Sequence, residues 1–262
     1  MIRALDLSRV APMFEGRHDT LIRACLSGNL GGVWTDDPAS PAFAVMVAAD
    51  FTFFAGIPDH RAFSEFPWDA TKGYTLFTPP DSAWDALVNT WYGDKARPRT
   101  RYAIRHEPDA FDDARLAAYA AACPAPYVLR KFDEDLWCQS LREDWSASFC
   151  ENFRDWDDYA ARGIGWGVVL DGRLVAGASA YAVYPGGVEL EVDTHEAHRR
   201  RGLARASCAA AILDCRARGL YASWDAANRE SVALAESLGY HEMGSYTVYA
   251  IQAPAENGSK TR

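Results

Sequence analysis

An arginine cluster in the C-terminal half is the most prominent chemical feature of this sequence. Four arginines occupy the seven residues from Arg199 to Arg205, in a chain whose formal net charge is -9. Apolar and small residues recur at helical spacing from Leu203 onward, so the cluster is expected at the turn into a helix. The first turn of a helix has N–H groups without intrahelical partners and carries partial positive charge. The cluster therefore indicates a site for an anion such as a phosphate or diphosphate.

Gly202, inside the cluster, lets the backbone approach an anion closely because it has no side chain. Arg200, Arg201 and Arg205 add full positive charges around it. The competing interpretation is a solvated basic helix start that binds nothing. We favour the anion site because a predicted strand comes directly before the turn and Asn228 follows at the start of the next helix.

Three carboxylates alternate with apolar residues just before the arginines. Glu189, Glu191 and Asp193 are expected on one face of a strand that ends near Thr194. A solvent-facing strand side is the simple interpretation. If the strand is central, the carboxylates need water, a partner or a cationic substrate, because an isolated buried charge is costly.

This series of features resembles the GCN5-related N-acetyltransferase (GNAT) superfamily. Its acyl-coenzyme A signature, Gln/Arg-x-x-Gly-x-Gly/Ala, is matched by Arg199-Arg200-Arg201-Gly202-Leu203-Ala204. A strand comes before the motif, and a helix and another strand follow it. The later segments Asn228-x-x-Ser231 and Leu238-Gly239-Tyr240 are similar to the family's Asn-x-x-Ala and Leu-Gly-Phe.

A narrower resemblance extends towards the N-terminus. The segment Trp224-Asp225-Ala226-x-Asn228-x-x-Ser231 looks like the bacterial acetyltransferase family that includes zwittermicin A resistance protein. The upstream segments Gly32-Val33-Trp34 and Asp36-Asp37-Pro38 fit the same family but are less specific. This match would cover most of the chain.

The resemblance implies a GNAT fold in the C-terminal half, an α/β structure with a mixed sheet, and acetyl-coenzyme A (acetyl-CoA) as the cofactor. In the family, backbone groups at the strand end hold the pantetheine arm, and the next turn holds the diphosphate. The matched strand residues are Val192, Asp193 and Thr194. The matched turn residues are Arg199, Arg200, Arg201, Gly202, Leu203, Ala204 and Arg205.

Asn228 has two candidate roles. The family asparagine contacts the cofactor, and Ser231 occupies the next matched position. Asn228 also stands where an N-cap is expected for a helix from Arg229 to Leu238, with Gly239 beyond its end. Both roles are compatible with one position.

The implied reaction is acetyl transfer to a primary amine of a small molecule, by direct attack in a ternary complex. Attack requires the neutral amine, so a carboxylate acting directly or through one water is a suitable general base. We favour Glu191, then Glu189, and expect Asp193 to hold the substrate or a neighbouring backbone group. A backbone N–H near Val192 would polarise the thioester carbonyl. No cysteine is placed for an acyl-enzyme intermediate.

The sequence departs from the family at the general acid. Many members have a tyrosine seven residues after the asparagine, and here that position is Ala235. The replacement candidates are Tyr246, Tyr240, Tyr249 and solvent, and we carry Tyr246 forward as the candidate catalytic residue. Packing in the core is the competing interpretation for each tyrosine.

Other functions find little support in the sequence. The spacing of His195-Glu196-Ala197-His198 does not suit a zinc helix, and we predict no metal site. The acidic excess argues against binding to nucleic acid or to an anionic membrane. The N-terminus lacks a signal-peptide core and no apolar run is long enough to span a bilayer, so we expect a cytoplasmic protein. The six cysteines form no Cys-x-x-Cys pair and are expected to be reduced and mostly buried.

The break Cys123-Pro124-Ala125-Pro126 is the candidate domain boundary, although an internal loop would have the same composition. We predict an N-terminal α/β domain at 1–125 and a GNAT domain at 126–262. The first is interpreted as a degenerate acetyltransferase-like half that shapes the acceptor site. Helices are expected at 1–30, 82–91, 112–122, 134–144, 155–163, 203–218 and 229–238. Strands are expected at 33–35, 42–54, 99–105, 127–132, 165–170, 174–184, 188–194 and 220–225.

Two functions of other classes fit the same features. The chain would be a non-catalytic acyl-CoA sensor if catalysis requires the tyrosine that Ala235 replaces. It would be a resistance protein if it sequesters a drug without modifying it. Thiol release from acetyl-CoA in the presence of amines distinguishes an enzyme from both.

Overall fold

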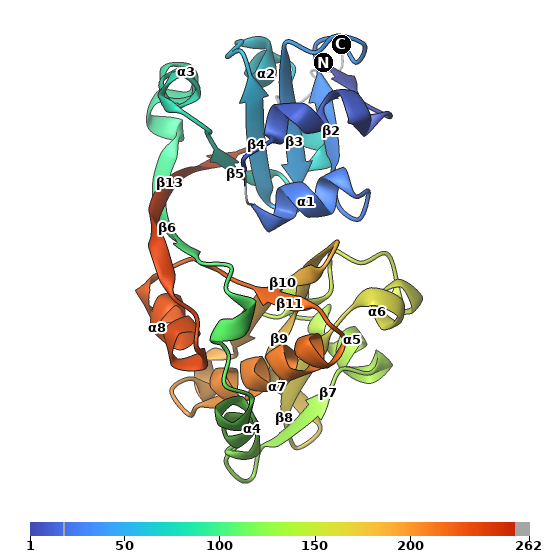
Figure 1. Cartoon of the computed structure of the whole chain (residues 1–262), viewed down its shortest axis with the longest axis vertical. Helices are drawn as coiled ribbons and strands as arrows, with labels where there is room; N and C mark the ends of the chain where they lie inside the picture. The colour runs from blue at the N-terminus through green and yellow to red at the C-terminus, as the bar shows by residue number, and fades with distance from the viewer. Residues whose placement is uncertain (18, 255–262) are drawn as a thin grey trace, which may run out of the picture. The chain divides into compact units, whose positions relative to one another are not determined.

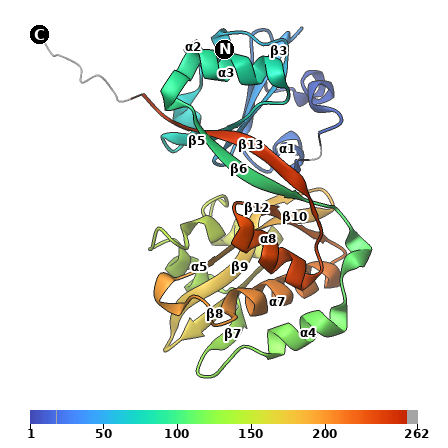
Figure 2. The same ribbon diagram turned by 90° about the vertical axis from the view of Figure 1, so that its left-hand side faces the viewer.

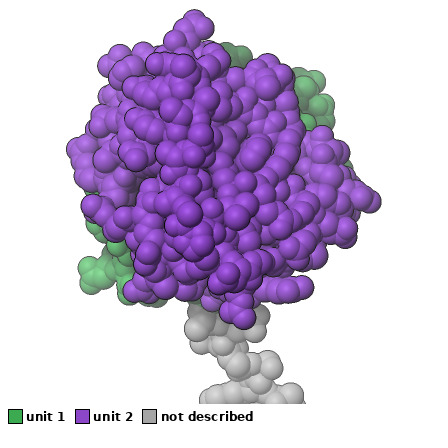
Figure 3. All heavy atoms as spheres, turned by 90° about the horizontal axis from the view of Figure 1, so that it is seen from below, with its two compact units in different colours: residues 1–100, 247–262 green, residues 101–246 purple. Residues whose placement is uncertain are grey.

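The computed structural model describes residues 1–17 and 19–254 and divides the chain into two compact units (Figure 1). The first unit comprises residues 1–100 together with the segment from Thr247 onward, and the second comprises Arg101–Tyr246. Figure 3 colours them green and purple. Two strands carry the chain from one unit into the other, β6 (Arg97–Ile104) and β13 (Glu242–Gln252).

This division differs from the predicted boundary at 125/126. Helix α4 (Asp113–Ala121) packs along α7 (Leu203–Ala217) within the second unit, so the Cys123 to Pro126 break is a loop inside that unit. The return of the C-terminal segment to the first unit is a long-range pairing. Local sequence pattern carries no signal for such a pairing, which explains the difference.

The second unit is built on a mixed five-stranded sheet in the order β11-β10-β9-β8-β7. Its neighbours pair antiparallel except β10 and β11, which are parallel. The predicted hairpin at Asp171-Gly172 is present, and both residues have positive φ as a tight two-residue turn requires. Its strands are β7 (Val128–Lys131), β8 (Gly165–Leu170), β9 (Arg173–Tyr184), β10 (Gly187–Thr194) and β11 (Tyr221–Ser223). The short strand β12 (Asp225–Ala226) pairs antiparallel with β6 in the other sheet.

Helices cover this sheet, and polar side chains fix where they begin. Asp133, Asp155 and Asn228 each accept a hydrogen bond from a backbone N–H of the first turn. The small residues of α7, Ala209 and Ala211 among them, are fully buried and let the helix pack closely on the strands. The helices are α5 (Glu134–Ser140), α6 (Trp156–Arg162), α7 and α8 (Arg229–Leu238), with short turns η5 (Pro108–Ala110), η6 (Ala147–Phe149) and η7 (Glu196–His198).

The first unit has the strand order β1-β2-β3-β4-β5-β13, with β6 next to β13. Aromatic side chains fill its core, notably Phe43, Phe54, Phe77 and Trp84. The strands are β1 (Ile2–Arg3), β2 (Gly32–Thr35), β3 (Phe43–Ala48), β4 (Phe51–Gly56) and β5 (Tyr74–Thr78). The helices are α1 (Thr20–Leu26), α2 (Arg61–Ser64) and α3 (Ser82–Tyr92), with short turns η1 (Leu7–Arg9), η2 (Ala11–Phe14), η3 (Trp68–Ala70) and η4 (Gly93–Lys95).

The helix predicted over 1–30 was wrong in extent. Only α1 is an α-helix there, and a short strand and two single turns precede it. Pro12 lies in η2 and Gly16 has φ +79°, so neither residue suits the interior of a continuous helix. The predicted strands at 33–35 and 42–54 are confirmed as β2, β3 and β4.

The two units repeat one pairing plan. In the first unit β1 to β4 pair antiparallel in chain order and β4 then pairs parallel with β5. In the second unit β7 to β10 pair antiparallel and β10 then pairs parallel with β11. A helical segment connects the parallel strands in each case, α2 and η3 in the first unit and α7 in the second. The same plan in both units fits a chain made of two related halves.

All six cysteines are unpaired, and Cys25, Cys150, Cys208 and Cys215 are buried, as predicted. Burial raises the pKa of Cys25, Cys150 and Cys215 to about 12 in each case. Such thiols stay protonated and are poor nucleophiles at neutral pH. No helix among residues 1–17 and 19–254 is long and apolar enough to cross a membrane.

Trp84 should be the main aromatic anchor of the first unit. It is fully buried, its ring centroid lies 4.8 Å from that of Phe54, and its Nε1 donates to the Gly56 carbonyl at 3.0 Å. We expect Trp84→Ala to lower the free energy of unfolding by about 3–5 kcal/mol. Trp91→Ala in the same helix is the control, because Trp91 is 46% exposed, and should cost less than about 1 kcal/mol. Urea unfolding followed by circular dichroism measures both, and equal losses would contradict the assignment.

Candidate functional site

Strands β10 and β11 of the second unit are paired over a short distance only. Their parallel register joins Gly187 to Tyr221, Val188 to Ala222 and Glu189 to Ser223, and ends there. Strand β10 continues to Thr194 with β9 as its partner on the other side. Residues 190–194 therefore lie beyond the last residue pair of β10 with β11. A strand that continues past its neighbour in this way can bind an extended ligand through backbone hydrogen bonds, as in strand addition.

The turn after β10 is open at the position of the predicted anion site. The strand ends at Thr194 and α7 begins at Leu203, as predicted. Gly202 precedes the helix with φ +79°, and a Cβ placed there would meet no atom within 4 Å. Leu203 is 1% exposed and packs against Val175 and Ala176 of the sheet. The helix start is thus held against the sheet by Leu203 and is accessible to solvent at Gly202.

The predicted arginines differ in their surroundings. Arg199 donates from Nε to the Thr194 carbonyl at 3.0 Å and its Nη2 lies 3.6 Å from Asp193 Oδ1, so it braces the strand end against the turn. Arg200 and Arg201 are exposed and form no ion pair with any described residue. Arg205 lies over the ring of Tyr119. Most of the positive charge at this turn is therefore left unneutralised by the protein.

Glu191 and Asp193 of β10 share the sheet face that carries Ser179. Ser179, which lies opposite Glu191, donates to the Phe149 carbonyl at 2.7 Å and hydrogen bonds Tyr159 at 2.8 Å. The pairing of β10 with β9 is regular from Leu190 to Thr194, whereas Glu189 lies beyond an irregularity between Glu189 and Leu190. Glu189 is 7% exposed, whereas Glu191 is half-buried.

Asp193 is engaged locally. It is half-buried, and its Oδ1 accepts a hydrogen bond from the Thr194 N–H at 2.6 Å. The same oxygen faces the Arg199 guanidinium. These contacts hold the strand end and the turn together, in agreement with the backbone-supporting role that the sequence predicted.

Tyr246 is brought next to the end of β11 by a polar cluster that the sequence did not predict. Its hydroxyl donates to Asp225 Oδ2 at 2.8 Å, and Arg101 Nε donates to Asp225 Oδ1 at 2.5 Å. Burial alone would lower the pKa of Arg101, but the Asp225 carboxylate outweighs it and raises that pKa above the usual value. Arg101 is therefore a permanent cation beside Asp225 and Tyr246.

The other tyrosine candidates for a general acid are engaged elsewhere. Tyr240 is buried and its hydroxyl donates to the Ala222 carbonyl at 2.8 Å. Burial raises the pKa of Tyr240 well above its usual value. Tyr249 belongs to the first unit, where its hydroxyl donates to Asp85 at 2.7 Å. Ala235 is fully buried in α8 and has no polar group to offer.

Asn228 is the N-cap of α8. Its side-chain oxygen accepts from the Ser231 N–H at 2.8 Å, and its exposed position leaves the rest of the amide towards solvent. Ser231 Oγ accepts a hydrogen bond from Trp224 Nε1 at 3.0 Å, so its hydroxyl serves the packing of Trp224. The structural role of Asn228 is confirmed, and its role towards a cofactor stays a prediction.

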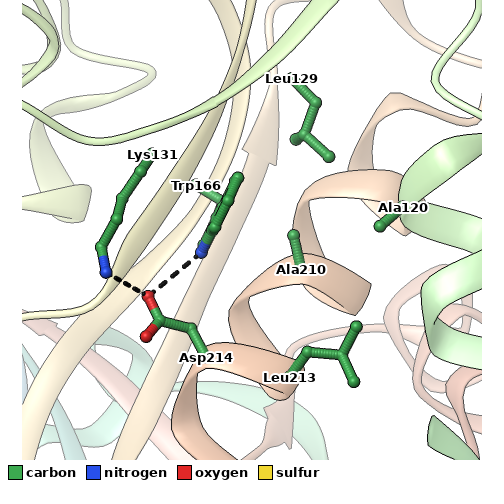
Figure 4. A pocket seen from close by; sticks show the side chains of 7 residues that line it. All are labelled: Ala120, Leu129, Lys131, Trp166, Ala210, Leu213 and Asp214. Carbon is green, nitrogen blue, oxygen red and sulfur yellow. Dashed lines mark hydrogen bonds and ion pairs between the residues drawn. The ribbon is translucent and has the colours of Figure 1, made fainter. Parts of the chain in front are cut away.

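An open groove of about 360 Å³ lies beside α7, away from the arginine turn (Figure 4). Apolar side chains line most of it, and its one carboxylate, Asp214, is bound by Lys131 at 2.8 Å, Arg218 at 2.9 Å and Trp166 at 3.2 Å. Burial alone would raise the pKa of Asp214, but Lys131 and Arg218 hold it below its usual value. A carboxylate held in this way is a weak general base.

The histidines between β10 and α7 have protein partners. His198 Nδ1 lies 3.0 Å from the Tyr127 hydroxyl, and the His195 ring packs edge-on against Trp145. Among the described residues, no group of three or more His, Cys, Asp or Glu side chains is arranged to hold a metal ion.

Comparison with known proteins places this geometry in a family. The model of the GNAT acetyltransferase family matches residues 11–249, which include almost all of both units. The chain belongs to the GNAT acetyltransferase family. The mixed sheet of the second unit, whose parallel strands β10 and β11 are connected by α7, is the GNAT fold that the sequence predicted.

Individual relatives extend over the same length. The uncharacterized N-acetyltransferase YdfB of Bacillus subtilis (strain 168) is 26% identical over 254 residues, which are 92% of this chain and 94% of that protein. The crystal structure of a GCN5-related N-acetyltransferase-like protein from Streptococcus suis 89/1591 is 35% identical, covers 93% of this chain and 97% of its own, and has a TM-score of 0.86. A tandem GNAT protein from the clavulanic acid biosynthesis pathway shares the fold at 16% identity, with a TM-score of 0.50 over 85% of this chain and 83% of its own. A tandem GNAT architecture fits the repeated plan of the two units.

Proposed function

We propose that this GNAT chain transfers acetyl from acetyl-CoA to a primary amine of a small molecule, by direct attack within a ternary complex. The observation that carries the proposal is the short pairing of β10 with β11, which leaves a strand edge beside an open, arginine-flanked helix start. Bound there, acetyl-CoA would supply the acetyl group as an activated thioester. Every other part of the reaction is assigned to residues of the chain.

The cofactor assignment follows the order of the strand and the turn. The backbone of Val192, Asp193 and Thr194, beyond the last β10–β11 pair, offers hydrogen bonds to a pantetheine arm. The backbone N–H groups from Arg200 to Arg205 face a diphosphate, with the arginine charges beside them. In this proposal Arg199 acts through the strand end, because its side chain is bound to Thr194. Leu203 and Ala204 contribute backbone N–H groups to the diphosphate site, and Asn228 contributes its side-chain amide. Ser231 acts indirectly, because its hydroxyl accepts the hydrogen bond of Trp224.

Glu191 is the proposed general base. It lies beyond the last β10–β11 pair and is half-buried, so an incoming amine can reach it directly or through one water. Glu189 is the second candidate and is more deeply buried. A backbone N–H near Val192 would stabilise the charge that develops on the carbonyl oxygen.

Tyr246 is the proposed general acid for the departing thiolate. Its hydroxyl donates to a side-chain carboxylate, Asp225, whereas the Tyr240 hydroxyl is buried on the Ala222 carbonyl and Tyr249 belongs to the first unit. Arg101 forms an ion pair with the same Asp225 carboxylate. Solvent is the alternative proton donor.

We further propose that the first unit is a degenerate GNAT half without cofactor. Its helix α2, in the place of α7, has four residues, and the Asp59 carboxylate accepts from the Arg61 N–H at that helix start. The Arg61 side chain also donates to Asp59, at 3.0 Å from Nε and 2.8 Å from Nη2, so this ion pair already occupies the helix start. Trp84 binds the carbonyl of Gly56 at the end of β4, the strand that corresponds to β10. That the N-terminal part of the chain shapes the acceptor site stays a prediction.

A non-catalytic acyl-CoA sensor is the second candidate function, because Ala235 replaces the usual tyrosine. Sequestration of a drug without modification, suggested by the resemblance to the zwittermicin A resistance family, is a third. Neither releases coenzyme A.

The decisive experiment is thiol release from acetyl-CoA in the presence of polyamines, aminoglycosides, amino acids and aminopolyol antibiotics. We expect amine-dependent release, together with an acetylated amine in the mass spectrum, for at least one class. Tight acetyl-CoA binding without turnover across the panel would favour the sensor.

Gly202 offers a test of the diphosphate site. Gly202→Asp should abolish measurable CoA binding, because it places a negative charge against the diphosphate. Gly202→Asn is the matched control, since Asn has the same shape, no charge and a similar tolerance of positive φ. Isothermal calorimetry should show the larger loss for Asp, and unchanged affinity in Gly202→Asp would refute the site.

Glu191→Gln should reduce kcat by roughly 10²–10⁴-fold while leaving the Kd for CoA unchanged, because the change removes proton acceptance without altering shape. The residual rate should rise with pH, since a more alkaline solution supplies the neutral amine. Glu189→Gln is the comparison and is expected to lose less. If kcat of Glu191→Gln equals the wild-type value, Glu191 is not the general base and another group has that role.

A further inference from the structure

Helix α4 lies beside α7 (Figure 2). One of its residues, Tyr119, contacts Arg205 of the arginine cluster. Asp112 caps α4 by accepting hydrogen bonds from the N–H groups of Ala114 and Arg115. Leu116 is fully buried beneath the helix, and Tyr119, one turn later, is half-buried against the same core. The Tyr119 ring therefore has a fixed place next to the first turns of α7.

Arg205 lies over this ring. It is the third residue of α7, and its Cζ is 4.7 Å from the Tyr119 ring centroid, well inside the range of a cation–π contact. A cation–π contact uses the charge of the guanidinium and none of its N–H donors. Tyr119 thus favours this position of Arg205 without occupying the hydrogen-bond donors.

The donors of Arg205 are open, unlike those of comparable arginines. Three other arginines of the second unit also lie over aromatic rings, and each of them is paired with a carboxylate. Those pairs are Arg162 with Asp158, Arg216 with Asp113, and Arg229 with Glu242. The side chain of Arg205 forms no ion pair or hydrogen bond with any residue that the structure describes. A cation held in place with open donors is suited to an anion from outside the chain.

The position of Arg205 indicates which anion. The diphosphate assigned to the Gly202 turn has Arg200 and Arg201 beside it, whereas Arg205 is drawn to the α4 side of the helix by Tyr119. Coenzyme A carries a further phosphate on its ribose. The pantetheine arm of a carrier protein has no ribose and no such phosphate.

We propose that Arg205, positioned by Tyr119, binds the ribose 3′-phosphate of the donor and so selects free acetyl-CoA over an acetyl group on a carrier-protein pantetheine arm. The inference rests on the proposed function, because it requires the donor diphosphate at Gly202. Tyr119 is a positioning residue here, and Arg205 makes the contact.

Calorimetry with CoA, 3′-dephospho-CoA and 4′-phosphopantetheine tests the inference on the full chain. Wild type should bind CoA about tenfold more tightly than 3′-dephospho-CoA, the value of one charge-assisted contact. Arg205→Gln should bring the ratio close to one by weakening CoA binding alone. Tyr119→Leu should reduce the ratio by roughly three- to fivefold, and Tyr119→Phe should retain it because the ring remains.

The matched control is Tyr102→Leu, which removes the ring beneath Arg229 and leaves the Glu242 partner of that arginine in place. The ratio should not change in this variant. Equal wild-type affinity for CoA and 3′-dephospho-CoA would overturn the inference and leave the proposed function standing, as would a loss in Tyr119→Leu that is the same for both ligands. Absence of binding by wild type to all three ligands would overturn the proposed function itself.

Discussion

The early end of the pairing between β10 and β11 is the constraint on which the second unit depends. Three residue pairs hold the strands in parallel register, and β10 continues beyond Glu189 along β9. Backbone groups of a folded sheet normally find partners, so the stretch of β10 that extends past the short strand β11 is suited to binding a ligand. The helix start at Gly202 and the carboxylates of β10 can act on a ligand because they lie next to this opening.

Charges of both signs flank the strand end. Arg200 and Arg201 are exposed at the turn and Glu191 is half-buried on β10, while Asp193 and Arg199 are paired with each other. A negatively charged carrier and a basic amine would each meet the charge that favours it. Asp225 and Tyr246 lie beyond the last β11 residue and complete the polar surroundings with the Arg101 cation.

Local pattern was sufficient to predict much of this arrangement. The strand end at Thr194, the helix start at Leu203 and the cap at Asn228 follow from periodicity and capping, and all three are confirmed. Strands β5 and β13 were missed because their pairing partners are remote, and the domain boundary was placed differently for the same reason. The contact between Arg101 and Asp225 joins residues 124 apart in sequence, which no single-sequence pattern encodes.

Strand β13 has a consequence for how the protein is made. Its last residues, Tyr249 to Gln252, pair with Phe77 to Tyr74 of β5, so the first unit closes its sheet with the final segment of the described chain. A ribosome that has released residues 1–100 has therefore produced a sheet with one bare hydrogen-bonding edge. That edge stays available to other nascent chains until β13 has been synthesised. Expression of residues 1–100 alone would make this defect permanent.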